Sequence, residues 1–232
     1  MTGAVKIIND LQNLLFPASC LCCKALIPDS SQFICVQCSH QLPLTAFTDR
    51  EANPCEKIFF GRVPIEQATS LLWYHKNGPV QHLIHELKYH GRQKAGTFLG
   101  NWLGEEMKTS PRFNNIDLVI PMPLQKRRHR KRGYNQTDNF ARALAQHLEA
   151  PFRNDLLIRC DTTSTLTHRG RKTRIFDASQ SFEVISEDLR SYRHVLLTDD
   201  VVTTGTTLES AARVIKKYSD IKVSIATMAI TY

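Results

Sequence analysis

The chain has 232 residues, 42% hydrophobic and 22% charged, which suits a soluble globular protein with one full-sized core and a small additional module. No stretch approaches the roughly 18 uninterrupted apolar residues of a membrane span, and no basic leader opens the chain, so we expect a cytoplasmic protein. The net charge of +8 is concentrated, because residues 126–132 hold six Lys/Arg and residues 169–174 hold four, both without an acid. This favours local anion sites, and the alternative for each cluster is a solvated positive face.

Two pairs of cysteines near the amino terminus, Cys20/Cys23 and Cys35/Cys38, have the C-x-x-C spacing of metal-binding knuckles. The chain has seven cysteines, and an odd number without a signal peptide argues against a disulfide framework. Two knuckles can close a tetrahedral four-thiolate site, and the metal would stabilise a segment too short to bury its own core. The pattern therefore predicts structural zinc, with a redox role as the alternative. Cys22 can replace Cys23 in this pattern.

The zinc-ribbon-like module is predicted to occupy residues 1–60, and the main domain residues 61–232. Ahead of the cysteines, Ile8, Leu11 and Leu15 have helical spacing, which predicts a short amphipathic helix that docks on the rest of the chain. Cys55 and Cys160 stand outside the cysteine motif, and we expect both to be small buried hydrophobic residues.

The main domain alternates between strand and helix patterns, which predicts an α/β fold with a parallel central sheet flanked by helices. Ligands of such sheets gather at the carboxyl ends of the strands. Residues 121–132, the segment after residue 158 and the pair Asp199/Asp200 all lie at such ends. In chain order we expect strands at 68–75, 116–123, 155–158, 194–200 and 221–230, and helices at 79–91, 94–108 (weakened by its glycines), 135–149 and 207–218.

A threonine-rich loop follows the strand that ends at the aspartate pair, and it leads directly into a helix. Unpaired backbone N–H groups and the helix dipole favour an anion at such a position. The glycine permits a tight path, and threonine hydroxyls add further donors. The loop suits a monophosphate, and it is neither a Walker A loop nor a G-x-G-x-x-G motif. Its residues are Thr203, Thr204, Gly205, Thr206 and Thr207.

The two adjacent carboxylates of Asp199 and Asp200 would repel a phosphate, so they need a different partner. Their natural partners are hydroxyl groups, or a hydroxyl-bound Mg²⁺, a few ångströms from the phosphate. A ribose 5-phosphate offers a phosphate beside a vicinal diol, and the sequence therefore predicts such a ligand.

Two long segments carry a resemblance to a known family. VLLTDDVVTTGTTLESA (195–211) resembles the signature of type I phosphoribosyltransferases, which use 5-phosphoribosyl 1-diphosphate (PRPP). DLVIPMPLQKRRHRKRGYNQTDNFARALA (117–145) resembles the ComF family of competence and GntX-like proteins. The amino-terminal C-x-x-C pairs match that family as well, so the resemblance covers almost the whole chain.

The resemblance implies a type I phosphoribosyltransferase fold and a role for each part of the site. Asp199 and Asp200 would hold the ribose hydroxyls, Thr203–Thr207 would cradle the 5′-phosphate, and the loop that begins at Pro121 would face the diphosphate. Loss of diphosphate leaves an oxocarbenium-like centre, and Mg²⁺ with basic side chains can stabilise the departing charge. Our candidates for these basic groups are Lys88, Arg128 and Arg132, each with a solvated charge as the alternative.

Residues 159–182 are polar and without periodicity, as expected of an active-site lid. They resemble the mobile hood of the family, in which Thr163, Thr165, Arg171 and Arg174 occupy matching positions, and Arg174 would bind PRPP. Leu166 and Asp177 stand where relatives have glutamine and asparagine, which alters polar recognition in the lid.

The predicted function is therefore a ComF-type protein that binds or transfers a phosphoribosyl group with Mg²⁺, in a cell context of DNA uptake. The alternative is a module without catalysis that contacts single-stranded DNA or the competence machinery through the basic segment 126–132 and Tyr134. A phosphatase with an aspartyl nucleophile is a weaker third interpretation, because Asp199 and Asp200 are adjacent and do not form a D-x-D motif.

Overall fold

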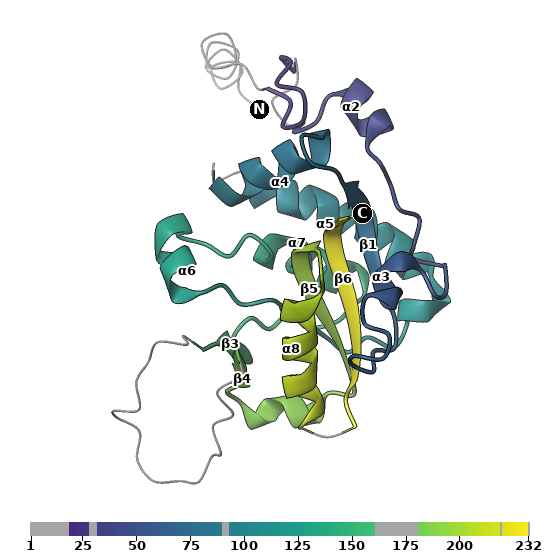
Figure 1. Cartoon of the computed structure of the whole chain (residues 1–232), viewed down its shortest axis with the longest axis vertical. Coiled ribbons are helices and arrows are strands. Elements are labelled where there is room, and N and C mark those ends of the chain that lie inside the picture. Colours follow the sequence, from purple (N-terminus) through teal and green to yellow (C-terminus); the bar gives the residue numbers. More distant parts are fainter. Residues whose placement is uncertain (1–18, 28–31, 90–92, 161–180, 219, 232) are drawn as a thin grey trace, which may run out of the picture.

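The computed structural model describes residues 19–27, 32–89, 93–160, 181–218 and 220–231. In these residues the core is a parallel sheet of four strands in the order β1 (Ala68–Tyr74), β6 (Lys222–Thr231), β5 (His194–Val202) and β2 (Leu118–Pro121). The strands are apolar on both faces because helices cover both faces, as parallel sheets require. The predicted α/β architecture with a parallel central sheet is confirmed (Figure 1).

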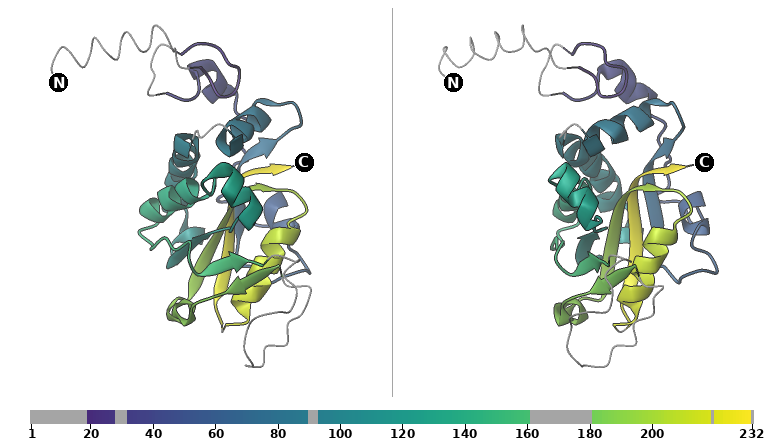
Figure 2. Two further views of the ribbon diagram at one scale, coloured as in Figure 1. Left: turned by 90° about the vertical axis from the view of Figure 1, so that its left-hand side faces the viewer. Right: turned by 60° about the vertical axis from the view of Figure 1, so that its left-hand side comes forward.

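Each face of the sheet has its own hydrophobic cluster. On one face Val119, Leu196 and Ala226 pack with helices α4 (Pro79–Tyr89), α5 (Gln93–Thr109) and α7 (Asp138–His147). On the other face Leu118, Leu197 and Ile225 pack with α8 (Thr206–Lys216) and the short α3 (Pro54–Lys57). The alternation of neighbouring strand residues between the two clusters follows from the pleat of the strands. Figure 2 shows the sheet between these helix layers.

The glycines of α5 lie where this helix crosses α7. A Cβ added at Gly100 would lie 2.6 Å from the carbonyl oxygen of Phe140, which is closer than real atoms approach. The glycines therefore allow the two helices to pack closely, although they weaken α5 as an isolated helix.

One predicted strand belongs to a different sheet. β3 (Leu157–Arg159) pairs antiparallel with β4 (Phe182–Val184), and the two form a separate sheet. The expectation that this strand belongs to the alternating parallel units is wrong, because the chain after β3 returns beside it as β4. No hydrophobic period could predict β4, since its three residues are too few.

The basic segment forms a helix that the sequence analysis did not predict. α6 (Lys126–Arg132) ends at Gly133, whose φ of 76° is left-handed and whose N–H donates to the carbonyl oxygen of His129 at 2.7 Å. This is the helix ending that glycine favours. Because α6 has no apolar face, hydrophobic periodicity could not reveal it. Other short helices in the described part of the chain are α2 (Val36–Gln41), η1 (Pro111–Phe113) and η2 (Glu187–Ser191).

The amino-terminal segment packs against the main sheet at several places. The N–H of Trp73 donates to Pro43 at 2.8 Å, and Phe47 and Phe59 are buried in the cluster beside α8. Nearer the cysteines, Lys24 forms an ion pair with Glu86 of α4. The division at residue 60 stays a prediction. The predicted helix around Ile8–Leu15 and the lid residues 161–180 lie outside the described residues.

Membrane insertion by a helix finds no support in the described ranges. None of the helices there combines the length and the apolar character needed to cross a bilayer.

Candidate functional site

The aspartate pair lies near the carboxyl end of β5, in the middle of the sheet. Asp199 is half-buried, whereas Asp200 is 7% exposed. The backbone N–H of Asp200 donates to Asp199 Oδ1 at 2.8 Å, and that of Val201 donates to Asp200 Oδ1 at 2.6 Å. Both side chains are therefore fixed by the local backbone at the edge where ligands of parallel sheets bind.

Asp200 is the centre of a set of polar contacts from two other elements. Lys88 Nζ, near the end of α4, lies 2.9 Å from Asp200 Oδ2. Gln136, in the segment between α6 and α7, donates from Nε2 to the same oxygen at 2.8 Å. A buried carboxylate needs such partners, because an unpaired charge in this position would be costly.

These contacts continue into a ring of five residues that is closed by the backbone of α4, and we call it the Asp200 ring: Lys88, Tyr89, Arg132, Gln136 and Asp200. Arg132 Nη1 donates to Gln136 Oε1 at 2.7 Å. Its guanidinium also lies 5.0 Å from the ring centroid of Tyr89, within range of a cation–π interaction. Since Tyr89 follows Lys88 in the chain, the ring closes through α4.

Asp199 differs from an ordinary aspartate in its protonation. Burial and the neighbouring charge of Asp200 raise the pKa of Asp199 to about 7, against a partial opposing effect of Lys88 and Arg159. Burial, followed by the positive charge of Arg128, lowers the pKa of Arg159, while Asp199 opposes that shift. Arg128 and Arg159 are thus within electrostatic range of one another and of the acid pair.

The threonine loop connects β5 to α8 and has the predicted tight path. Gly205 has a φ of 71° and precedes the first helical residue of α8, and the hydroxyls of Thr204 and Thr206 lie 3.1 Å apart. Arg62 contacts the Thr204 carbonyl and pairs with Glu209, which fixes the outer side of the loop. All four threonines of the loop are exposed, so a ligand can reach their hydroxyl groups.

Pro121 is the last residue of β2 and lies opposite Thr198 in the adjacent β5. The next residue is held on both sides: the N–H of Met122 donates to Thr198 at 2.8 Å, and its carbonyl accepts from Asn135 Nδ2 at 3.1 Å. The loop that begins at Pro121 therefore starts beside the acid pair.

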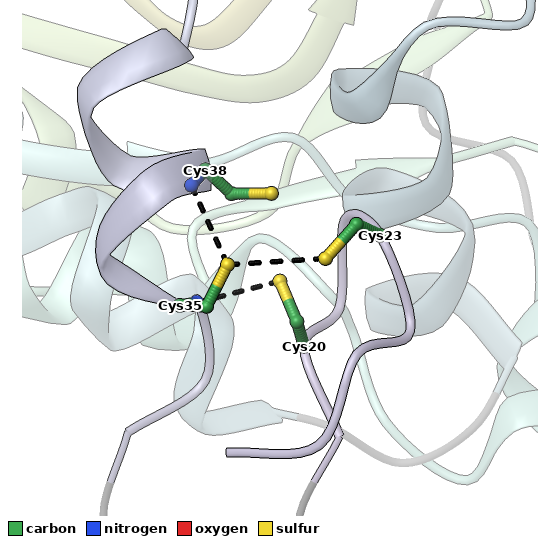
Figure 3. A group of neighbouring side chains, drawn as sticks. All are labelled: Cys20, Cys23, Cys35 and Cys38. Atoms are coloured by element: carbon green, nitrogen blue, oxygen red, sulfur yellow. Dashed lines mark hydrogen bonds between the residues drawn. The ribbon is translucent and has the colours of Figure 1, made fainter.

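The four predicted metal ligands form a second, separate site. The sulfurs of Cys20, Cys23, Cys35 and Cys38 all lie within 4.8 Å of one another. Figure 3 shows these four side chains grouped together. Cys20 and Cys23 come from one turn, whereas Cys35 and Cys38 flank the start of α2. The predicted four-cysteine cluster is confirmed, and it could hold a metal such as zinc.

The geometry of the cluster fits a thiolate-bound metal. Cys23 Sγ and Cys35 Sγ lie 3.8 Å apart, and sulfurs at about 2.3 Å from a tetrahedral zinc are separated by a similar distance. Backbone N–H groups of Cys35 and Cys38 donate to Cys20 Sγ and Cys35 Sγ, both at 3.4 Å. Although burial opposes it, backbone N–H groups, first that of Cys23, lower the pKa of Cys20 to about 6. These donors favour the thiolate form that a metal needs.

The other cysteines have different environments. Cys22 is buried, and its sulfur is not part of the cluster formed by the described residues; burial raises the pKa of its thiol to about 12. The structure therefore favours Cys23 as the ligand. Cys55 is fully buried, as expected. Cys160 is only half-buried, so the expectation of a buried residue is wrong for it; the residue directly follows the short β3.

Comparison with known proteins gives relatives along most of the chain. The DNA utilization protein YhgH of Shigella flexneri is 28% identical over 198 residues, which cover 84% of this chain and 82% of the relative. Competence protein F of Haemophilus influenzae is 30% identical over 143 residues, 60% of this chain and 62% of the relative. The chain is a homologue of these ComF-type proteins.

Comparisons with family models and with solved structures say less about this chain than these two relatives do. No protein-family model matches the chain. A hypoxanthine phosphoribosyltransferase of Staphylococcus aureus has a TM-score of 0.34 and 16% identity, with 60% of this chain and 64% of that chain covered.

The structure of this ComF homologue brings together most of the residues that its sequence singled out. Asp199, Asp200, Lys88 and Arg132 are joined in one region, and their roles stay predictions. Arg174 lies outside the described residues. Three further groups near the acids were not predicted from the sequence: Tyr89, Gln136 and Arg159. For Gln136 a signal existed, since it follows the basic run in GYNQ, whereas nothing in the sequence placed Arg159 near Asp199.

Proposed function

We propose that this chain binds PRPP with Mg²⁺ and transfers its phosphoribosyl group. The observation that carries the proposal is the succession of two carboxylates and a threonine loop at one helix amino terminus, with Lys88 and Arg132 beside the acids. The loop offers unpaired N–H groups and hydroxyls to the 5′-phosphate, and the helix dipole adds to the attraction.

The acid pair keeps room for the ribose diol. A carboxylate has about four acceptor positions. Among the contacts of the described residues, Asp200 uses three, from Lys88, Gln136 and Val201, and Asp199 uses one, from the N–H of Asp200. Two hydroxyl donors can therefore be accepted without breaking the Asp200 ring.

The basic groups supply what the leaving diphosphate requires. Departure of diphosphate from C1′ places negative charge on that group and positive charge on the ribose. Lys88, Arg132 and Arg128 would face the developing negative charge, and the acids would face the ribose. Mg²⁺, when bound with PRPP, would neutralise diphosphate charge and lower the barrier to its departure.

A second candidate function is binding of single-stranded DNA, which the names of the relatives favour. Six of the seven residues of α6 are Lys or Arg, and all except Arg132 are exposed. An exposed basic helix can track a nucleic-acid backbone, and such binding weakens steeply with salt. The PRPP site and this helix can act in one protein, because only Arg132 and Arg128 are assigned to both.

Calorimetric titration of the wild-type chain tests the PRPP proposal. We expect saturable binding of PRPP with Mg²⁺ and weaker binding of ribose 5-phosphate, which lacks the diphosphate. The affinity for PRPP should change little when single-stranded DNA is added. If PRPP shows no binding while single-stranded DNA binds with a steep salt dependence, the DNA-binding interpretation replaces the PRPP proposal.

We further propose that the four-cysteine cluster holds one structural zinc ion per chain. In Cys23→Ser we expect loss of the metal, since the variant leaves three thiolates, whereas Cys22→Ser should keep it. Metal analysis of the purified proteins and thermal unfolding check this. Equal zinc content in both variants would contradict the assignment of Cys23.

PRPP binding should strengthen as the pH rises through about 7, because ionised Asp199 accepts hydroxyl hydrogen bonds better than the protonated acid. Titrations of PRPP between pH 6 and 8 measure this change in affinity, and Asp199→Asn separates it from titration of the ligand phosphate.

The free energy of unfolding changes in the opposite direction to the PRPP affinity. The pKa of about 7 exceeds the ordinary 3.8, so the folded state holds this proton more tightly than the unfolded state, and the resulting contribution to stability is lost as the pH rises from about 4 to about 7.

A further inference from the structure

Gln136 is a buried amide between two opposite charges. Its side chain lies in the segment before α7, and the residue is 5% exposed. The Nε2 group donates to Asp200 Oδ2 at 2.8 Å, and Oε1 accepts from Arg132 Nη1 at 2.7 Å. Both polar ends of the amide are therefore used, one by an anion and one by a cation.

We propose that Gln136 is a positioning residue that separates Arg132 from Asp200 and orients both toward the ligand. The inference rests on the proposed PRPP function and names a further residue of that site. Arg132 and a carboxylate form a strong bidentate pair when they can meet. The intervening amide satisfies both and keeps the guanidinium free to face an anion.

The chemistry of the amide explains why glutamine is suited to this position. Glutamate would turn an oxygen toward Asp200 Oδ2 and repel it, although it could still accept from Arg132. Methionine has nearly the same length and volume but makes neither hydrogen bond. Asparagine is one methylene shorter, and we expect it to reach only one of the two partners.

The local backbone does not depend on this side chain. Asn135 Nδ2 donates to Met122 at 3.1 Å, Thr137 Oγ1 donates to Asn135 Oδ1 at 2.9 Å, and the N–H of Ala141 donates to Thr137 at 2.9 Å. These bonds hold the segment on both sides of Gln136. We therefore expect Gln136→Met to fold, and the variant can report on positioning alone.

A double-mutant cycle with PRPP and Mg²⁺ tests the inference. Hydrogen bonds to charged groups contribute enough that we expect Gln136→Met to weaken PRPP binding about tenfold. Arg132→Met should have a similar effect, and the double variant should bind no more weakly than the weaker single variant, because Gln136 acts through Arg132. Gln146→Met, at an exposed site on α7, is the matched control and should bind like the wild type. Additive losses, or unchanged binding in Gln136→Met, would overturn the inference.

A measurement without PRPP separates this inference from the proposed function. In the wild type we expect slowly exchanging guanidinium N–H signals of Arg132 in nuclear magnetic resonance spectra, assigned by their loss in Arg132→Met. They should shift or broaden in Gln136→Met and stay unchanged in Gln146→Met. If the wild type binds no PRPP but these signals respond, the proposed function fails and the contact assigned to Gln136 stands. If the signals do not respond, Gln136 does not position Arg132.

Discussion

In the variant Asp199→Asn/Asp200→Asn we expect PRPP affinity to fall about a hundredfold or more. Each carboxylate that accepts a ribose hydroxyl contributes a charge-assisted hydrogen bond, worth about 1.5–3 kcal/mol, and both are weakened together. The loss of charge also leaves Lys88 without its anionic partner at 2.9 Å. Calorimetry at constant Mg²⁺ measures the effect, and thermal unfolding shows whether the fold is retained.

The matched control for this variant removes two carboxylates from another part of the protein. Asp155 and Asp188 are both exposed. Both pair with Arg153, whose nitrogens lie 2.7 Å from Asp155 Oδ1 and 3.4 Å from Asp188 Oδ2. Asp155→Asn/Asp188→Asn changes the formal net charge equally and should bind PRPP like the wild type. A similar loss in both double variants would show that total charge, rather than contact with the ribose, controls binding.

In Gly205→Ala we expect a large loss of stability together with weaker PRPP binding. Gly205 has a φ of 71°, and an added Cβ would lie 2.5 Å from Ile58 Cγ2 and 2.9 Å from the ring of Phe59. The left-handed backbone costs roughly 1–2 kcal/mol for alanine, and the steric conflict adds about 1–3 kcal/mol. Relief of the conflict must move either the buried Phe59 or the amino terminus of α8.

Gly61→Ala separates these two contributions. Gly61 has the same φ of 71°, but among the described residues no atom lies within 4 Å of an added Cβ. Chemical unfolding should show only the backbone cost in Gly61→Ala and a clearly larger loss in Gly205→Ala. Equal losses would mean that the contact with Ile58 and Phe59 does not constrain the threonine loop.

Periodicity and spacing predicted the elements that obey a simple pattern. The strands that became β1, β2, β5 and β6 are apolar runs, and the helices between them have an apolar face, so both could be located. The two C-x-x-C pairs likewise predicted the cysteine cluster. Only the folded chain could choose Cys23 over Cys22, because the choice depends on which sulfur points into the cluster.

The features of the fold and the site that could not be predicted depend on contacts between residues that are distant in the chain. β3 and β4 pair although they are far apart in the chain, so the three residues of either strand do not predict the pairing. Gln136 lies 64 residues from Asp200 in the chain, and only its place after the basic run, not its neutral side chain, could have marked it as part of a site. The acids could be singled out because they are adjacent, whereas their partners come from separate elements.

The adjacency of Lys88 and Tyr89 on α4 restricts how this helix can vary. One residue added or removed between the start of α4 and Lys88 would rotate its last turn by about 100° and shift it by about 1.5 Å. Both side chains would leave their partners together, because one peptide bond joins them. Substitutions on the outer surface of α4 leave these contacts in place. A change in the length of α4 upstream of Lys88 would break both the contact of Lys88 with Asp200 and the contact of Tyr89 with Arg132.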